Sequence, residues 1–312
     1  MNTFQSFSTT FLHFCKHTRQ LDQKTLNAYS IDLSQFDSFL RSQDLSYHEK
    51  ASLKVYLEFL HSRYAPATVK RKLATLKAFF HYLEREELSV NPFHSLDTTF
   101  REPQRLPRYI PLHIIQTLIR AVQKEYTFAK SDHAKKYSLR DLAVIELLFS
   151  TGIRISELCL LPAVSIDLEA MEMKILGKGS KERLLQLEAS VIKTLRDYRD
   201  FFQNDIQRDG YFFISRRGGH LSDQSVRYML NCYMKKSGSH MHITPHMFRH
   251  TFAKSLLEQD VDIRIIQPIL GHSSITTTER YTYVSSTKQK QVLQDKNPLS
   301  LLDLNEKNEE SV

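Results

Sequence analysis

The chain of 312 residues has little of what cross-links a protein or anchors it in a membrane. Its three cysteines, Cys15, Cys159 and Cys232, lie far apart and form no Cys-x-x-Cys pair, so neither a disulfide framework nor a thiolate metal site is indicated. No apolar run approaches the ~20 residues that a bilayer span needs, and the N-terminus lacks the basic and apolar regions of a signal peptide. These absences predict a cytoplasmic protein in a reducing environment, without contact to a membrane.

Glycine is also scarce, at 8 of 312 residues, and long stretches repeat apolar residues at steps of three and four. This spacing places an apolar stripe on one face of a helix. One such helix is predicted from Thr25 and another from Pro66, a favourable first-turn residue. Their stripes consist of Leu26, Tyr29, Leu33, Phe36 and Leu40, and of Val69, Leu73, Leu76, Phe80 and Leu83. The pattern predicts a mainly helical fold.

Basic residues outnumber acidic ones, with 43 Lys and Arg against 35 Asp and Glu and a formal charge of +8. A surface of this charge attracts polyanions such as nucleic acid, although a mildly basic enzyme with a solvated surface explains it equally well. The predicted helix from Pro66 carries four cations on its polar side, Lys70, Arg71, Lys72 and Lys77. They are candidate contacts to a DNA backbone, with a solvated helix face as the equal alternative.

Prolines interrupt the helical pattern between Val90 and Pro111. Proline of this density among polar and basic residues favours extended chain, which is typical of a linker. The last residues are acidic and poor in apolar side chains, so they are predicted to be disordered. We expect a helical domain over 1–104, a linker near 93–110, a second domain over 105–300 and a tail over 301–312.

One segment of the second half has the pattern of a β-hairpin. Within 171–187, the apolar residues Met173, Ile175, Leu184 and Leu185 flank Gly-Lys-Gly-Ser-Lys at 177–181, which predicts two strands joined by a turn. Lys178 is therefore expected at the tip of a small sheet.

A histidine and arginine cluster follows Pro245, which predicts a helix start that brings His246, Arg249 and His250 within one turn. Metal binding is one explanation, because His242, His246 and His250 recur every four residues. However, Pro245 disfavours a continuous helix through His242, and the cluster contains no acidic ligand. Phosphate binding fits better, because arginine pairs bidentately with phosphate oxygens and histidine moves protons near neutral pH. For any one of these residues alone, a structural role is the alternative.

Two further motifs and a tyrosine complete a recognisable set. Arg154 lies in Thr-Gly-Ile-Arg-Ile-Ser-Glu-Leu, Lys178 lies in Gly-Lys-Gly-Ser-Lys-Glu-Arg, and His272 of a Gly-His pair precedes Tyr281 by nine positions. Together with the His-x-x-Arg-His helix, their order and spacing closely resemble the tyrosine recombinase (integrase) family, and within it the Xer-type site-specific recombinases. The resemblance covers almost the whole chain.

The resemblance implies a two-domain C-clamp architecture, in which a helical core-binding domain of SAM-like type precedes a mainly helical catalytic domain with a small antiparallel sheet. It implies that the residues of the motifs are catalytic and that two neighbours support them. The catalytic set is Arg154, Lys178, His246, Arg249, His272 and Tyr281, and the supporting residues are Glu157 and His250.

The chemistry explains why these residue types are needed. Tyr281 is expected to attack a backbone phosphate and form a 3′-phosphotyrosine, while Arg154 and Arg249 neutralise the charge that builds on the non-bridging oxygens. No metal or other cofactor is then expected. His246 is expected to take the tyrosine proton, and Lys178 to give a proton to the departing 5′-oxygen.

Three positions need separate expectations. Pro268 interrupts the apolar series that leads to His272, the residue expected to hydrogen-bond the scissile phosphate, and predicts a kinked helix. Tyr283 is the alternative nucleophile, although the family spacing favours Tyr281. The basic segment 124–137 is expected to be a surface loop, with DNA contact as the alternative.

The predicted function is site-specific recombination of double-stranded DNA, in chromosome dimer resolution or in the integration and excision of a mobile element. The resemblance implies a homo- or hetero-tetramer on synapsed DNA, a DNA translocase or accessory protein as a further partner, and a nucleoid-associated location. It also implies that residues 287–302, with apolar Val292, Leu293, Leu299 and Leu302, dock onto a neighbouring subunit. A type IB topoisomerase and a catalytically silent DNA-binding paralogue are the alternatives.

Overall fold

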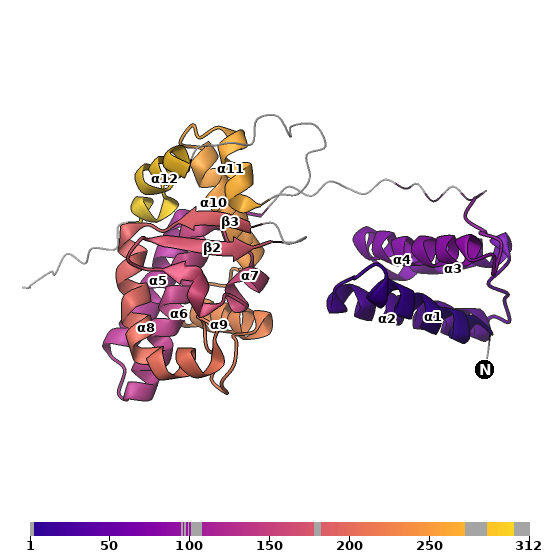
Figure 1. Cartoon of the computed structure of the whole chain (residues 1–312), viewed down its shortest axis with the longest axis horizontal. Coiled ribbons are helices and arrows are strands. Elements are labelled where there is room, and N and C mark those ends of the chain that lie inside the picture. Colours follow the sequence, from indigo (N-terminus) through magenta and orange to yellow (C-terminus); the bar gives the residue numbers. More distant parts are fainter. Residues whose placement is uncertain are drawn as a thin grey trace, which may run out of the picture. The chain divides into compact units, whose positions relative to one another are not determined.

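The computed structural model describes residues 3–94, 96, 98, 100, 108–177, 182–271 and 286–302. The chain divides into two compact units, Met1–Arg105 and Leu106–Val312, which are shown in Figure 1. As predicted, the fold is mainly helical, with a small antiparallel sheet in the second unit. None of the helices in the described ranges is long and apolar enough to cross a bilayer.

Four helices make up the described part of the first unit: α1 (Thr3–His17), α2 (Gln23–Ser42), α3 (Lys50–Arg63) and α4 (Pro66–Arg85). Asp22 caps α2 by accepting a hydrogen bond from the backbone N–H of Thr25. Both helices predicted from apolar spacing are confirmed, because their stripes face a common core. Of the ten stripe residues, nine are buried and Tyr29 is half-buried. Aromatic rings fill much of this core, with Phe4, Phe36, Phe79 and Phe80 in edge contacts.

The cationic side of α4 differs from the prediction at one position. Lys72 is only 2% exposed, and its Nζ lies 3.0 Å from the Asp32 carboxylate of α2. The prediction that Lys72 contacts DNA is therefore wrong, because its charge is held inside the unit by a buried partner. Arg71 pairs with the same carboxylate from a half-exposed position, and Lys70 and Lys77 are exposed.

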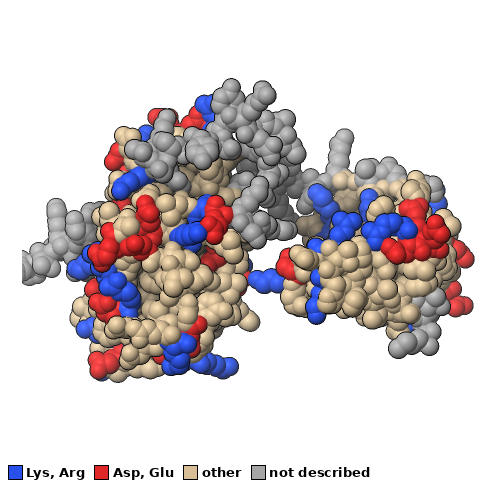
Figure 2. Space-filling view, viewed as in Figure 1, with Lys and Arg blue, Asp and Glu red and all other residues tan. Residues whose placement is uncertain are grey.

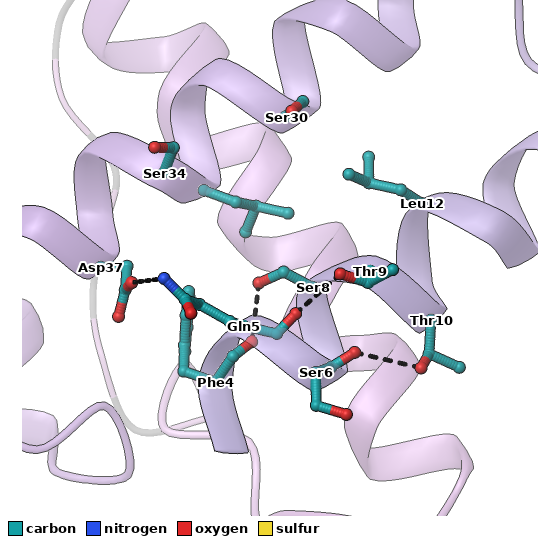
Figure 3. Close-up of a pocket in the computed structure, with 11 residues that line it drawn as sticks. Phe4, Gln5, Ser6, Ser8, Thr9, Thr10, Leu12, Ser30, Ser34 and Asp37 are labelled. Carbon is teal, nitrogen blue, oxygen red and sulfur yellow. Dashed lines mark hydrogen bonds between the residues drawn. The ribbon is translucent and has the colours of Figure 1, made fainter. Parts of the chain in front are cut away.

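A shallow groove of about 440 Å³ lies between α1 and α2 (Figure 3). Six of its eleven lining residues carry a hydroxyl group, and Gln5 donates a hydrogen bond to Asp37 at 3.3 Å. Asp37 is also paired with Arg41 at 2.7 Å. Because the groove combines hydroxyl groups with one neutralised carboxylate, it offers no acid, base and nucleophile together.

The second unit is built around helix α6 (Asp132–Thr151), whose residues from Ser138 onward are all buried. Figure 1 shows α5 (Leu112–Thr127) and α8 (Ala189–Asp209) beside it. The remaining elements are α7 (Ile155–Cys159), α9 (Asp223–Lys236), α10 (Pro245–Leu257), α11 (Ile263–Leu270), α12 (Ser286–Asp295), η1 (Ala163–Ser165) and η2 (Pro298–Leu301).

The sheet contains β1 (Ile166–Asp167), β2 (Glu172–Leu176) and β3 (Glu182–Gln186) in the order β1-β2-β3, with antiparallel neighbours. The predicted hairpin is confirmed by β2 and β3, which pair with Lys174 opposite Leu184. The two-residue strand β1 was not predicted.

One expectation about the second unit needs correction. The segment 124–137 is not a loop, because it forms the end of α5 and the start of α6 with only residues 128–131 between them. Pro268 lies within α11, which continues past it and ends at Leu270 before Gly271.

The C-terminal segment packs on its own unit. Leu293, Leu299 and Leu302 are buried in the core of the second unit, and Val292 packs against that core. Helix α12 contacts β3, and η2 contacts α6 and α10. In the single chain, these apolar residues therefore already have a binding surface.

Charged side chains of both signs are interspersed on the faces of the two units seen in Figure 2. On these faces, the net charge of +8 does not gather into one basic patch.

Candidate active site

A glycine turn positions Arg154 at the start of α7. Gly152 ends α6 with φ of +60°, and a Cβ atom there would lie 2.6 Å from the ring of Phe252. Only glycine fits this combination of backbone angle and close packing. Glu157 fixes the next turn, because its Oε2 accepts a hydrogen bond from the backbone N–H of Arg154 at 3.1 Å.

Helix α10 brings Arg249 to the same turn. The helix starts at Pro245, as the sequence predicted, and Thr244 caps it. Buried Phe248 and Phe252 fix which face points inward. Arg249 is 7% exposed, and its Nη1 donates to the carbonyl oxygen of Gly152 at 2.9 Å. The two arginines expected to share one phosphate therefore meet at one backbone turn.

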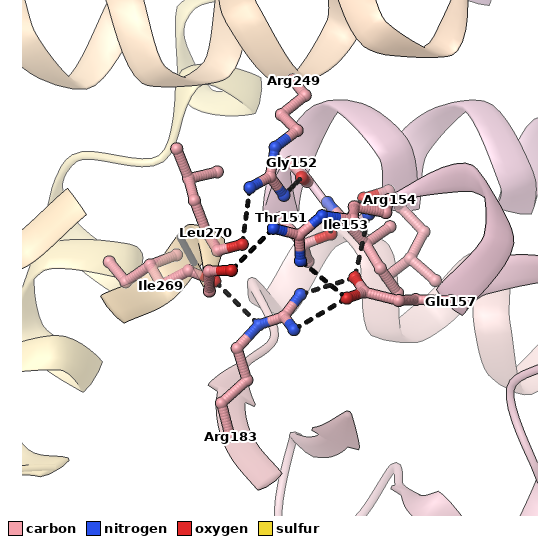
Figure 4. A network of polar contacts seen from close by, with 11 residues as sticks. Thr151, Gly152, Ile153, Arg154, Glu157, Arg183, Arg249, Ile269 and Leu270 are labelled. Atoms are coloured by element: carbon pink, nitrogen blue, oxygen red, sulfur yellow. Dashed lines mark hydrogen bonds and ion pairs between the residues drawn. The ribbon is translucent and has the colours of Figure 1, made fainter. Parts of the chain in front are cut away.

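Glu157 lies between two arginines (Figure 4). Its Oε1 accepts from Arg154 Nη1 at 2.9 Å, and both of its oxygens pair with Arg183 of β3, at 3.0 and 2.7 Å. Burial alone would raise the pKa of Glu157, but the hydrogen bonds and charges of Arg183 and Arg154 outweigh it and hold the pKa below its ordinary value. Glu157 is therefore ionised at neutral pH and orients both guanidinium groups.

The carboxyl end of α11 is held by three arginines. The last carbonyl groups of a helix have no partner inside it and carry partial negative charge, so cations stabilise them. Gly271 follows the helix with φ of +63°. The pairs are Arg183 Nε with Ile269 O at 3.0 Å, Arg249 Nη2 with Leu270 O at 2.6 Å, and Arg154 Nη2 with Gly271 O at 2.6 Å.

This cluster has a surplus of positive charge. Arg154, Arg183 and Arg249 surround one carboxylate, that of Glu157. Burial and the neighbouring charge of Arg154 lower the pKa of Arg249 to about 10. This pKa is still well above 7, and Arg249 is therefore protonated near neutral pH. Such a surplus in a partly buried site attracts an anion and stabilises charge that develops on it.

His246 and His250 are exposed on α10, beside the arginine cluster. Partial desolvation lowers the pKa of His246, and the charges of Arg227, His250, Arg249 and Arg154 lower it further. The ring is therefore mainly neutral at pH 7 and can accept a proton.

The structure brings together Arg154, Glu157, Arg249 and His246 of the predicted set. Lys178, His272 and Tyr281, together with Tyr283, lie outside the described residues. Within the part of the chain that is described, no group of three or more His, Cys, Asp or Glu side chains could hold a metal ion.

Sequence reasoning missed two residues of the site. Arg183 closes the motif that contains Lys178, but its partners Glu157 and Ile269 come from distant elements. Arg227 of α9 acts on His246 through its charge, and no local pattern singles it out.

Comparison with known proteins places this site in a family. Residues 115–288 match the Phage integrase family, and residues 9–87 match the Phage integrase, N-terminal SAM-like domain. The chain is 48% identical over 300 residues to a tyrosine recombinase of Agathobacter rectalis, covering 96% of this chain and 98% of that protein. It is 34% identical over 294 residues to the tyrosine recombinase XerC of a Staphylococcus epidermidis strain, covering 93% of this chain and 96% of that protein.

Solved structures agree in fold. The XerH site-specific recombinase bound to a palindromic difH substrate, in its post-cleavage complex, superposes with a TM-score of 0.68 at 21% identity, covering 91% of this chain and 83% of that chain. A lambda integrase (residues 75–356) bound to DNA superposes with a TM-score of 0.65 at 19% identity, covering 90% and 95%. The chain belongs to the phage integrase family of tyrosine recombinases, which are site-specific DNA recombinase enzymes.

Proposed function

We propose that this protein is a Xer-like recombinase that cleaves and rejoins double-stranded DNA through a 3′-phosphotyrosine on Tyr281. The observation that carries the proposal is the pairing of Arg154 and Arg249 around Gly152 and the end of α11. Two guanidinium groups that converge from different helices suit the two non-bridging oxygens of one phosphodiester.

The proposed reaction exchanges one phosphate ester for another. The oxygen of Tyr281 bonds to phosphorus while the bond to the 5′-oxygen breaks. The tyrosine proton passes to neutral His246, and Lys178 protonates the departing 5′-oxygen. His272 hydrogen-bonds the phosphate, and His250 supports the cluster. Because the covalent link retains the energy of the broken ester, a 5′-hydroxyl group of another strand can reverse the step without ATP.

The proposed assembly is a homo- or hetero-tetramer on two synapsed sites, with residues 1–104 and 105–300 as its DNA-binding and catalytic domains. In it, residues 287–302 leave the surface that they occupy on their own unit and bind the neighbouring subunit. A DNA translocase or accessory protein is proposed as a further partner, and a nucleoid-associated location follows from the substrate. XerH, which shares this fold, was crystallised bound to a palindromic difH substrate.

The test begins with sheared genomic DNA, from which the protein captures its site as a covalent complex. That site is then rebuilt as a nicked suicide duplex, which traps the adduct because the cleaved end diffuses away. The wild-type protein is expected to form the adduct, also in EDTA. Tyr281→Phe should bind the duplex without forming it, and Tyr283→Phe should behave as the wild type.

Three results would contradict parts of the proposal. An adduct that persists in Tyr281→Phe and disappears in Tyr283→Phe would make Tyr283 the nucleophile. Relaxation of a supercoiled plasmid that lacks the site would favour the topoisomerase alternative. Specific binding by a wild-type protein that never forms an adduct would favour the catalytically silent paralogue.

A further inference from the structure

We propose that Arg183 is a positioning residue for strand cleavage, which keeps the Arg154 guanidinium available to the phosphate by holding its competitor, the Glu157 carboxylate. This inference rests on the proposed function and extends it to a residue outside the motif set. It concerns how the charge of Arg154 is preserved, because Nε, Nη1 and Nη2 of Arg183 are already committed to Ile269 and Glu157.

The contacts of Arg183 use most of its guanidinium group. Its side chain is 12% exposed, and Nη1 and Nη2 form a bidentate pair with Glu157 at 3.0 and 2.7 Å. Its Nε donates to the carbonyl oxygen of Ile269 at 3.0 Å. Figure 4 shows the group between Glu157 and the end of α11. A planar fork with three directed donors fits this place, and the point charge of a lysine does not.

Glu157 is shared unequally between the two arginines. Arg183 occupies both carboxylate oxygens side by side, whereas the side chain of Arg154 reaches only Oε1, at 2.9 Å. Arg154 spends a second donor on the carbonyl oxygen of Gly271. A guanidinium group has five N–H donors, so the contacts within the described part of the chain leave Arg154 three donors for an incoming phosphate.

Without Arg183, this balance would change. Glu157 is buried to a side-chain exposure of 9%, and an ionised carboxylate at that depth needs a full partner. Arg154 is the other guanidinium in contact with it and would form the bidentate pair instead. Glu157 would then neutralise the charge of Arg154 and occupy the donors that would otherwise bind the phosphate.

The same side chain ties the hairpin to the arginine cluster. Arg183 is the second residue of β3, and a Cβ atom on Gly271 would lie 2.9 Å from its Nη1. The strand that follows Lys178 in the sequence is therefore fastened to the turn that precedes His272. Arg183 thus connects β3, which follows the proposed general acid Lys178 in the sequence, with the turn that precedes the second histidine, His272.

The experiment measures single-turnover cleavage of the nicked suicide duplex, the Kd for DNA and the melting temperature for each variant. Arg183→Met should slow cleavage by about tenfold to a hundredfold, with the Kd within about threefold of the wild type. The cleavage rate of Arg183→Lys should lie between those of the wild type and Arg183→Met. The matched control is Lys174→Met, which breaks the ion pair of Lys174 with Glu182 on the exposed face of the same hairpin and should cleave at the wild-type rate.

Two further measurements separate positioning from structural support, at a temperature where all variants are folded. A methylphosphonate at the scissile position carries no charged non-bridging oxygen, so the defects of Arg183→Met and of Arg154→Ala should both shrink on it. Adding Glu157→Gln to Arg183→Met should restore part of the lost rate, because a neutral amide no longer cancels the charge of Arg154.

The positioning role would be overturned if Arg183→Met slowed cleavage equally on the phosphodiester and the methylphosphonate. It would also be overturned if the double variant Arg183→Met/Glu157→Gln were slower than Arg183→Met. Wild-type cleavage accompanied by an unchanged rate in Arg183→Met would overturn it as well. A wild-type protein that forms no adduct would instead refute the proposed function, and this inference with it.

Discussion

The side-chain amide of Asn297 donates a hydrogen bond to the carbonyl oxygen of Ser150 at 2.9 Å, although 147 positions separate the two residues. Ser150 lies in the last turn of α6, where backbone carbonyl groups have no partner within the helix. Asn297 is fully buried, and its Oδ1 accepts from the N–H of Leu299 at 3.0 Å. The C-terminal segment therefore caps the helix that leads directly into the turn holding Arg154 and Arg249.

Asn297→Ala should lower the free energy of unfolding by about 1–3 kcal/mol, because it leaves a buried carbonyl group and a buried N–H without partners. Urea denaturation measures the loss. Gln294→Ala, at an exposed position of α12, is the matched control and should change little. Equal unfolding midpoints for the two variants would show that the amide does not stabilise the end of α6.

Asp32→Ala should destabilise the protein by about 3–5 kcal/mol, since it leaves the charge of Lys72 buried without a carboxylate. The pair lies inside the first unit, with 3.0 Å between Lys72 Nζ and Asp32 Oδ1. Lys77→Met, at an exposed position of the same helix, is expected to leave the unfolding curve unchanged. If Asp32→Ala unfolds at the wild-type urea concentration, the buried ion pair is not what holds α2 to α4.

Lys72 shows where sequence reasoning stops. All five core positions that the apolar spacing predicted in α4 are buried. Lys72, next to Leu73 at the border of that stripe, is buried as well, and the spacing did not predict this. A lysine is expected in water unless a carboxylate meets it, and here that carboxylate lies 40 residues earlier. The periodicity of one helix contains no information about such a partner.

The same limit applies to the site. Sequence motifs, taken together with their resemblance to a known family, identified Arg154, His246 and Arg249. The role of Arg183 depends on Ile269, which is 86 positions away. The error over 124–137 has a different origin, since the start of α6 is visible in the sequence. Ser131 caps that helix through the N–H of Ala134, and the run of charges obscured this signal.

Glu146→Gln should stabilise the protein at pH 8 and leave its stability unchanged near pH 4.5. Burial raises the pKa of Glu146 from 4.5 to about 7, so below about pH 4.5 the group is neutral in both the folded and the unfolded state. Between these values only the unfolded state ionises, and the free energy of unfolding falls as pH rises. The gain at pH 8 is on the order of 3 kcal/mol, and it is measured by denaturant unfolding at both pH values. A gain of the same size at both would contradict the assigned pKa.

His246 gives the proposed reaction a predictable pH dependence. Its ring must be neutral to accept the proton of Tyr281, and partial desolvation together with the charge of Arg227 holds its pKa below the ordinary value. The rate of adduct formation should therefore rise with pH along a limb centred below about 6.5, the ordinary histidine value, and be level by pH 7.

Arg227→Gln should move that limb toward higher pH, because the variant lacks the charge that most strongly disfavours protonation of His246. Adduct formation should slow below about pH 6.5 and remain near the wild-type rate at pH 8, where the ring is neutral in both proteins. Arg217→Gln removes the same charge from an exposed turn and should leave the limb in place, which separates the local effect from the change in net charge. Single-turnover rates between pH 5 and pH 8 measure both. A limb that moves equally in both variants would mean that net charge controls it, and one that moves in neither would exclude His246 as the acceptor.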